Sequence, residues 1–436
     1  MDAIAKMPTY EAYKDSGVDW IGFIPEQWEV KRFKFLLKEI NIRSKTGSEQ
    51  LLSLSKYSGV VPKDSLEERA GAAESLVGYK KVFINDLVIN KMQAVNGLLA
   101  VSKLDGITSP DYSVYRPIKS DLLDYRYLGY LLSMPEYLGE FKRRVTGVME
   151  GFIRLYTEDL YSIPSILPCI RMQELIATFL DQKTAQIDEA IAIKEQQIAL
   201  LKERKQIIIQ KAVTQGLDPD VPMKDSGVDW IGEIPAHWEV KRLKYVLEER
   251  NERSVTGEEP LFMVSQIHGL VVRADYHDKA EVAASNIDNK IVHKNDLVFN
   301  KLKAHLGVFF KSNINYCGLV SPDYAVYKCK SHIEDAKYLE LLFRHPSYIG
   351  QFIIRATGIV EGLIRLYTGD LFDMPVPIAP EQEQREILNF IERQGEKFDL
   401  ALEIQINQIT KLKEYKTTLI NSAVTGKIRI TPEMLA

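Results

Sequence analysis

The stretch KDSGVDWIG at residues 14–22 returns unchanged at residues 224–232. The stretch WEVKR at residues 28–32 returns at residues 238–242, and 238 minus 28 gives the same offset of 210 positions. A repeat of that length is far longer than the units of about 20–50 residues that stack into solenoids. The sequence therefore contains two copies of a whole domain, each followed by a tail.

The tail of each copy shows the period of a coiled coil. Apolar or long side chains recur in alternating steps of four and three from Ile176 to Ala212, and the same positions recur from Ile387 to Ala423. This 3.5-residue period is typical of the seam between paired helices. The residues that we expect to make spacer or partner contacts are Ile187, Ile191, Ile198, Leu201, Phe398, Leu402, Ile409 and Leu412.

Two matched helices in one chain favour pairing with each other. A homodimeric stalk is the alternative, but the second helix is already present at high effective concentration. Pro168 and Pro380 precede the helices, and Gly216 and Gly426 follow them, as expected for helix ends. Because the first helix leads into the second copy and the second helix starts there, pairing along their length requires an antiparallel arrangement.

The predicted fold class is α+β, with two homologous α+β domains separated by two long antiparallel coiled-coil helices in a pseudo-twofold arrangement. Short β-rich runs next to turn residues, such as Val82-Phe83-Ile84 before Asn85-Asp86, indicate a modest sheet in each domain. The expected boundaries are residues 1–167 and 217–379 for the domains, 168–216 and 380–426 for the helices, and 427–436 for a C-terminal tail.

Composition indicates an ordinary folded protein. Of 436 residues, 45% are hydrophobic and 27% charged. Cys169, Cys317 and Cys329 form no Cys-x-x-Cys pair, so neither a disulfide framework nor a zinc site is expected. The amino terminus lacks the apolar core of a signal peptide, and no apolar run approaches the ~18 residues that span a bilayer. We expect a cytoplasmic protein without membrane contact.

The motifs of common enzymes are missing from the sequence. It contains no Gly-x-Gly and no Gly-x-x-x-x-Gly-Lys loop, which argues against bound nucleotide or methyl donor. All seven histidines lie at or after His237, so no histidine-based catalytic or metal site can be common to both copies. We expect no catalytic residues, no metal and no cofactor in this chain.

Two short motifs resemble catalytic ones. Ser109-Pro110-Asp111-Tyr112 and its copy at Ser321 resemble the element with which adenine methyltransferases hold a flipped base, but Asp replaces the second proline, so a structural turn is favoured. Asp19 with Glu29 and Lys31 resembles the carboxylates and lysine of a Mg²⁺-dependent nuclease. An endonuclease therefore remains an alternative.

Comparison of the two copies suggests how they contact DNA. Matching cations suit the phosphate backbone, whereas diverging loops suit base contacts. The net charge of −4 argues weakly against nucleic acid, but the distribution of charge matters more than its sum. The candidate DNA-binding residues are Lys31, Arg32, Lys56, Tyr57, Asn90, Lys91 and Arg154 in the first copy and Lys241, Arg242, Gln266, His268, Asn300, Lys301, Lys303, His305 and Arg365 in the second.

The doubled arrangement resembles the specificity (S) subunit of Type I restriction-modification systems. The resemblance rests on the repeated run that begins at Asp15 and Asp225, on the Ser-Pro-Asp-Tyr pair, and on the long helices that end in Ala-Val-Thr at Ala212 and Ala423. It covers nearly the whole chain in the order recognition domain, spacer helix, recognition domain, spacer helix.

This resemblance implies a non-catalytic DNA-binding subunit. It implies two target-recognition domains that read a bipartite, asymmetric double-stranded target with a fixed gap. It also implies docking of two modification subunits, which methylate adenine N6 with S-adenosylmethionine, and of restriction subunits, so that S-adenosylmethionine, ATP and Mg²⁺ are expected on the partners. A scaffold whose two domains bind proteins without DNA is the other alternative, and the acidic pI of about 6.1 favours it.

Overall fold

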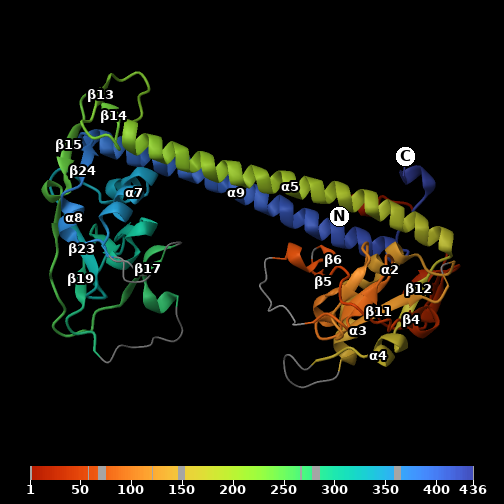
Figure 1. Ribbon diagram of the computed structural model, residues 1–436. Coiled ribbons are helices and arrows are strands. Elements are labelled where there is room, and N and C mark those ends of the chain that lie inside the picture. The colour runs from red at the N-terminus through yellow and green to blue at the C-terminus, as the bar shows by residue number, and fades with distance from the viewer. Residues whose placement is uncertain are drawn as a thin grey trace. The chain divides into compact units, whose positions relative to one another are not determined.

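The computed structural model describes residues 2–56, 58–66, 75–119, 121–145, 153–265, 268–276, 285–357 and 365–435. The chain forms two compact units, one of Met1–Glu195 with Ile406–Ala436 and the other of Gln196–Gln405. Each unit contains one copy of the repeated domain and parts of two long helices, α5 (Ile170–Gln215) and α9 (Glu381–Val424) (Figure 1). The N-terminal and C-terminal segments of the chain therefore belong to the same unit.

A four-stranded antiparallel sheet forms the centre of each repeated domain. In unit 1 its order is β4 (Leu37–Glu39), β11 (Tyr112–Pro117), β8 (Leu87–Asn90) and β9 (Leu99–Val101). In unit 2 the same order is formed by β16 (Leu247–Glu249), β23 (Tyr324–Cys329), β20 (Leu297–Asn300) and β21 (Phe309–Lys311). The two copies thus share strand order and pairing direction.

The two faces of this sheet are covered differently. Side chains alternate between faces along a strand, and Leu87 and Ile89 of β8 accordingly join a core that contains the helices α2 (Tyr125–Leu132) and α3 (Pro135–Arg144). Val88 joins a smaller core beneath the hairpin of β5 (Leu52–Ser55) and β6 (Gly59–Pro62). Unit 2 repeats this with α6 (Lys337–Phe343), α7 (Pro346–Arg355) and the hairpin of β17 (Phe262–Ser265) and β18 (Gly269–Val272).

Shorter elements complete each domain. Unit 1 contains α1 (Asp2–Ala5), β1 (Tyr13–Asp15), β2 (Phe23–Pro25), β3 (Glu29–Arg32), β7 (Lys80–Val82), β10 (Gly106–Thr108), α4 (Thr157–Ser162) and β12 (Pro164–Leu167). Unit 2 contains β13 (Met223–Asp225), β14 (Glu233–Pro235), β15 (Glu239–Arg242), β19 (Lys290–Val292), β22 (Gly318–Val320), α8 (Thr368–Phe372) and β24 (Pro375–Ile378). In both units the strand formed by Glu-Val-Lys-Arg pairs with the strand that precedes a long helix.

The two long helices pair antiparallel within each unit. In unit 1, Lys416 Nζ of α9 lies 2.7 Å from Asp188 Oδ1 of α5. In unit 2, Lys205 Nζ of α5 lies 2.6 Å from Asp399 Oδ1 of α9. Both contacts fit one antiparallel register, because the residue number in α9 falls from 416 to 399 as that in α5 rises from 188 to 205. The predicted fold class, with long paired helices in one chain, is confirmed.

The end of each long helix packs on the domain that lies in the same unit. The helix α9 ends in unit 1, where Gly426 has a φ of 74° and its carbonyl oxygen accepts a 3.0 Å hydrogen bond from the Tyr13 hydroxyl. Beyond it Ile428 and Ile430 are buried, and the Arg429 N–H donates to the Pro8 carbonyl oxygen at 2.7 Å. The helix α5 ends in the same way in unit 2, where Ala212 and Val213 join the core around Trp238.

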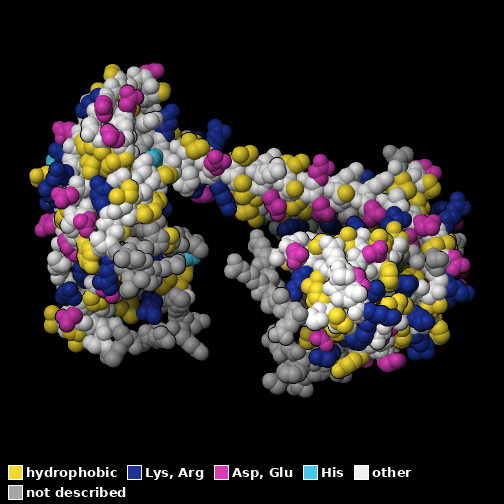
Figure 2. Space-filling view, in the orientation of Figure 1, with side chains coloured by type: hydrophobic (Ala, Val, Ile, Leu, Met, Phe, Trp, Pro, Cys, Tyr) yellow, Lys and Arg dark blue, Asp and Glu magenta, His cyan; other side chains and the backbone are white. Residues whose placement is uncertain are grey.

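The residues predicted for the helix seam are shielded to different degrees. Ile187 and Ile191 are buried, with exposed fractions of 7% and 9%. The other predicted seam residues, Ile198, Leu201, Phe398, Leu402, Ile409 and Leu412, are partly exposed. Leu200, Ile207 and Leu400 lie outside the predicted seam and are more than half exposed. Hydrophobic side chains are accordingly visible along the helices in Figure 2.

Candidate nucleic-acid interface

A loop that follows the central strand carries the strongest candidates. Asn90 and Asn300 end β8 and β20 and are only 7% and 8% exposed. Their Oδ1 atoms accept hydrogen bonds from the backbone N–H groups of Met92 and Leu302, at 3.1 and 3.0 Å. The asparagine side chain therefore fixes the backbone at the start of the loop. Lys91 or Lys301 lies between the two bonded residues.

A second segment joins this loop in both units. The Leu155 N–H donates to the Lys91 carbonyl oxygen at 3.0 Å, and the Leu366 N–H donates to the Lys301 carbonyl oxygen at 3.2 Å. These bonds place Arg154, which is exposed, and Arg365, which is partly exposed, beside the loop, each one residue before the bonded leucine. Residues that lie more than 60 positions apart in sequence therefore meet, as 154 minus 91 is 63.

The Ser-Pro-Asp-Tyr segment forms the predicted turn next to them. Its serine hydroxyl accepts from the backbone N–H of the aspartate, at 3.3 Å in each copy. In unit 2 the Asp323 carboxylate lies 3.6 Å from the Arg365 guanidinium. The turn leads into β11 or β23, and Tyr112 and Tyr324 pair with the asparagines that close the loop.

A buried lysine that is not among the residues predicted from the sequence supports this junction in both copies. Lys80 is 4% exposed, and its Nζ donates to the Tyr112 carbonyl oxygen at 2.7 Å and lies 3.8 Å from Glu39. Lys290 is 3% exposed and its Nζ lies 3.3 Å from Glu249. The two lysines are 210 positions apart in strands of alternating burial, and this repetition is the signal that could have identified them.

Burial and neighbouring cations lower the pKa of one junction lysine in each unit. Burial lowers the pKa of Lys80, and the positive charge of Lys91 lowers it further. Burial likewise lowers the pKa of Lys301, with a further lowering by Lys290 and Arg365, while Glu249 and Asp323 counteract it. In each unit, the loop lysine and the buried lysine are therefore close enough to repel each other, which favours an anion at the junction.

The diverging turn between the hairpin strands lies near this junction. Lys56 and His268 are exposed on the two turns, and the His268 ring centroid lies 4.9 Å from that of Tyr276. The glycines that end the turns, Gly59 and Gly269, approach Ala100 of β9 and Phe310 of β21. Tyr57 and Gln266, also predicted to contact DNA, lie outside the described residues.

The remaining candidate cations are placed elsewhere or lie at the end of the loop. Lys31 and Lys241 form ion pairs with Glu29 and Glu239, at 2.7 and 2.8 Å, on strands that belong to a separate two-stranded sheet. Arg32 is exposed on the same strand as Lys31, and Arg242 lies 3.4 Å from Asp373. Lys303 is exposed in the loop of unit 2, where the side chain of His305 is outside the described part.

The charge on the surface is mixed rather than of one sign. Figure 2 shows Lys and Arg side chains interspersed with Asp and Glu over the visible face of each repeated domain. The acidic total of −4 is thus compatible with local cationic junctions. The presence of the same junction in both units is a stronger indication of a nucleic-acid interface than the net charge is.

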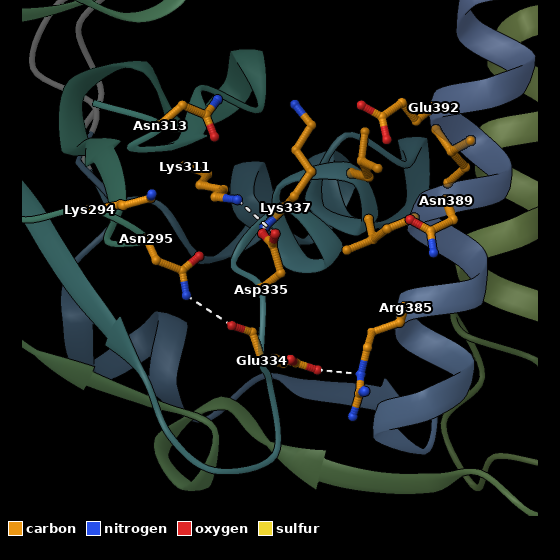
Figure 3. Close-up of a pocket in the computed structure, with 13 residues that line it drawn as sticks. Lys294, Asn295, Lys311, Asn313, Glu334, Asp335, Lys337, Arg385, Asn389 and Glu392 are labelled. Carbon is orange, nitrogen blue, oxygen red and sulfur yellow. Dashed lines mark hydrogen bonds and ion pairs between the residues drawn. The ribbon is translucent and has the colours of Figure 1, made fainter. Parts of the chain in front are cut away.

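Unit 2 contains a pocket of about 830 Å³ between α6 and α9 (Figure 3). At the corresponding place in unit 1, the Tyr130 hydroxyl of α2 donates to Asp181 of α5 at 2.8 Å. In unit 2 the counterparts are Leu341 and Glu392, and both line the pocket. Its charged lining is largely paired within itself, since Lys311 and Arg385 lie 2.7 and 2.6 Å from Asp335 and Glu334.

The nuclease alternative gains no support from the described residues. Glu29 pairs with Lys31, and a hydrogen bond from that lysine lowers the pKa of Glu29. Within the described ranges there is no group of three or more His, Cys, Asp or Glu side chains placed to hold a metal ion. Among the helices described, none has the length and apolar composition needed to cross a membrane.

The fold places the chain in a recognisable class of protein. It superimposes with a TM-score of 0.65 on a chain from a study of complex assembly and conformational transition of the type I R-M system, with 15% identity and coverage of 92% of this chain and 98% of the other. It superimposes with a TM-score of 0.52 on the HsdS subunit from Thermoanaerobacter tengcongensis, with 14% identity and coverage of 93% and 98%. Its architecture is therefore that of S subunits.

Sequence similarity points to the same class. The chain is 23% identical over 427 residues to the Type I restriction enzyme MjaVIII specificity subunit of Methanocaldococcus jannaschii, covering 93% of this chain and 94% of that protein. No protein-family model matches the chain. The resemblance to Type I specificity subunits is confirmed, and these are non-catalytic subunits of their systems.

Proposed function

We propose that this chain recognises the DNA target of a Type I restriction-modification enzyme. One observation carries the proposal: both units build the same junction of loop lysine, buried lysine, Ser-Pro-Asp-Tyr turn and arginine, while the nearby hairpin turn differs between them. A junction common to both copies suits the phosphate backbone, which carries no sequence information. Turns that differ suit base edges, which do carry it.

The two units would then read two unlike half-sites of a bipartite target. Lys56 on one turn can bond guanine O6 or N7, whereas His268 and Gln266 on the other present a different set of donors and acceptors. The long helices connect the domains and would fix the gap between the half-sites. This arrangement accounts for an asymmetric target read by a single chain.

Catalysis would reside on partner subunits. We propose that two modification subunits, which transfer a methyl group from S-adenosylmethionine to adenine N6, dock on this chain, and that restriction subunits that use ATP and Mg²⁺ join them. The exposed apolar residues Leu200, Ile207 and Leu400 on the paired helices are candidates for part of such a contact. The chain itself would need no cofactor.

Sequencing of methylated sites tests the proposal. Cells that carry the chain with its modification subunits should methylate one bipartite motif, and Lys91→Ala with Arg154→Ala should reduce methylation at every such site without changing the motif. Lys119→Ala, an exposed lysine of the same domain, is the matched control. Absence of a split motif would contradict the proposal.

DNA binding as a function of salt separates this function from a protein-binding scaffold. The logarithm of the binding constant should fall with the logarithm of the salt concentration, with a slope of about −0.9 for each phosphate contact. Lys301→Ala and Arg365→Ala should each make that slope less steep, by about one in magnitude. A scaffold without DNA contact would show no such dependence.

A further inference from the structure

A row of polar side chains in unit 2 ends at an exposed thiol. The strands β19 and β22 pair so that Val292 lies opposite Gly318, which brings the adjacent His293 and Cys317 together. Cys317 Sγ lies 3.5 Å from His293 Nδ1. His293 Nε2 in turn lies 2.8 Å from the carboxylate of Glu252.

Glu252 fixes the state of the imidazole. An ionised carboxylate only accepts hydrogen bonds, so Nε2 must carry a proton, and in the neutral ring Nδ1 then presents its lone pair to the thiol. Arg250 holds the carboxylate, with Nη1 3.4 Å from Glu252 Oε2. Arg250 is itself anchored by the buried Asp296, at 2.8 and 3.0 Å. The base is therefore both oriented and supported.

We infer that Cys317 is a nucleophilic modification site that reacts with small disulfides. His293 Nδ1 takes the thiol proton, and the thiolate attacks one sulfur of the disulfide. A sulfur–sulfur bond forms to Cys317 while the bond within the small disulfide breaks. The released thiolate takes the proton, so the small molecule is reduced to one thiol and Cys317 is oxidised to a mixed disulfide.

The site is confined to the second domain. Asp105, Phe83 and Ile42 stand in unit 1 at the positions of Cys317, His293 and Glu252. There the Asp105 carboxylate accepts a hydrogen bond from the Ile84 N–H at 2.7 Å. The thiol and its base are therefore absent from the copy that otherwise repeats the strand pairing.

The other two cysteines provide internal controls. Cys169 is exposed, but the residues that line the pocket around it include no histidine. Cys329 is partly exposed as a residue, yet burial of its thiol raises the pKa to about 12. Within one molecule, Cys317 can thus be compared with an exposed thiol that has no neighbouring base, Cys169, and with a buried thiol, Cys329.

An aromatic disulfide reagent that releases a coloured thiolate tests the inference on the full-length chain. Cys317 should react at least about tenfold faster than Cys169, with the sites assigned by mass spectrometry of peptides. Cys317→Ser should remove the fast phase, and His293→Gln should slow it to the rate of Cys169. His237→Gln, which changes an exposed histidine of the same domain that pairs with the Glu383 carboxylate, should leave the fast phase unchanged.

Glu252→Gln provides the second variant. It keeps the imidazole but removes the carboxylate that sets its tautomer, so the fast phase should slow by several-fold, while circular dichroism confirms that the variants remain folded. Equal rates for Cys317 and Cys169, or a fast phase that survives in folded His293→Gln, would overturn the inference. DNA binding plays no part in this measurement, so its outcome is independent of the proposed function.

Discussion

Arg365 Nη2 lies 3.6 Å from Asp323 Oδ1, so the Ser-Pro-Asp-Tyr turn brings an acidic side chain to the cationic junction of the second domain. The same carboxylate counteracts the lowering of the Lys301 pKa. A DNA phosphate that reaches this junction would have to approach Asp323 as well. The aspartate should therefore weaken binding that depends on phosphate contact alone.

Asp323→Asn should raise the affinity for random-sequence duplex by about three- to tenfold at low salt, because it removes one like charge from the phosphate site. Affinity for the cognate target should rise less, so discrimination should fall. Fluorescence anisotropy with both duplexes measures the two affinities. Asp229→Asn makes the same charge change at an exposed position of the same domain and should have no effect. Unchanged or weaker binding by Asp323→Asn would refute this role.

The architecture was largely predictable from sequence because its signals are local or repeated. The 3.5-residue period predicted both long helices, and the proline of Ser109-Pro110-Asp111-Tyr112 predicted a turn. The exact repetition of residues 14–22 predicted a duplicated domain. Each of these features depends on residues close in sequence, or on a comparison that one sequence allows.

The junction itself was only partly predictable because its contacts are non-local. Lys80 and Glu39 come from separate strands, β7 and β4, and only the folded sheet shows that this lysine is buried against the carboxylate. The sequence predicts Asn90 as a DNA-contacting residue, but in the structure its side chain is largely buried and accepts a hydrogen bond from the loop backbone. The packing of Ile428 and Ile430 on the first domain also had no sequence signal.

His345 predicts a pH dependence of stability. Its Nδ1 accepts a hydrogen bond from the Ser347 N–H at 3.2 Å at the start of α7, and burial lowers the pKa of His345 below 6.5. The unfolded chain therefore binds a proton at higher pH than the folded chain does. As the pH falls through 6.5 toward the lowered pKa, the free energy of unfolding should fall.

His345→Asn should remove this component, because an asparagine oxygen can accept the same backbone hydrogen bond at any of these pH values. Urea denaturation at several pH values between 7.5 and 5.5 gives the free energy of unfolding for both proteins. The other histidines are common to both and cancel in the difference. Parallel pH curves for the two proteins would show that His345 does not contribute.

A side chain at position 426 should weaken the packing of the end of α9 on the first domain. The φ of Gly426, 74°, lies in the left-handed region, and an added Cβ would meet Pro25 and Trp28. Gly426→Ala should therefore destabilise unit 1 by about 1–3 kcal/mol. Gly139→Ala, within α3 at a position where an added Cβ would meet nothing within 4 Å, is the control. Equal denaturation midpoints for the two variants would contradict the strain and the clash.

Under the proposed function, the gap between the half-sites should depend on the length of the two long helices. One heptad inserted in α5 after Glu195 and one in α9 after Gln405 keeps the 3.5-residue seam and lengthens each helix by about 10 Å, or roughly three base pairs of rise. Sequencing of methylated sites should show a longer gap, or no methylation, with both half-sites unchanged. An insertion in α5 alone shifts its seam against α9 and should abolish methylation. If the doubly lengthened chain methylates sites with the original gap, the helices do not set the spacing.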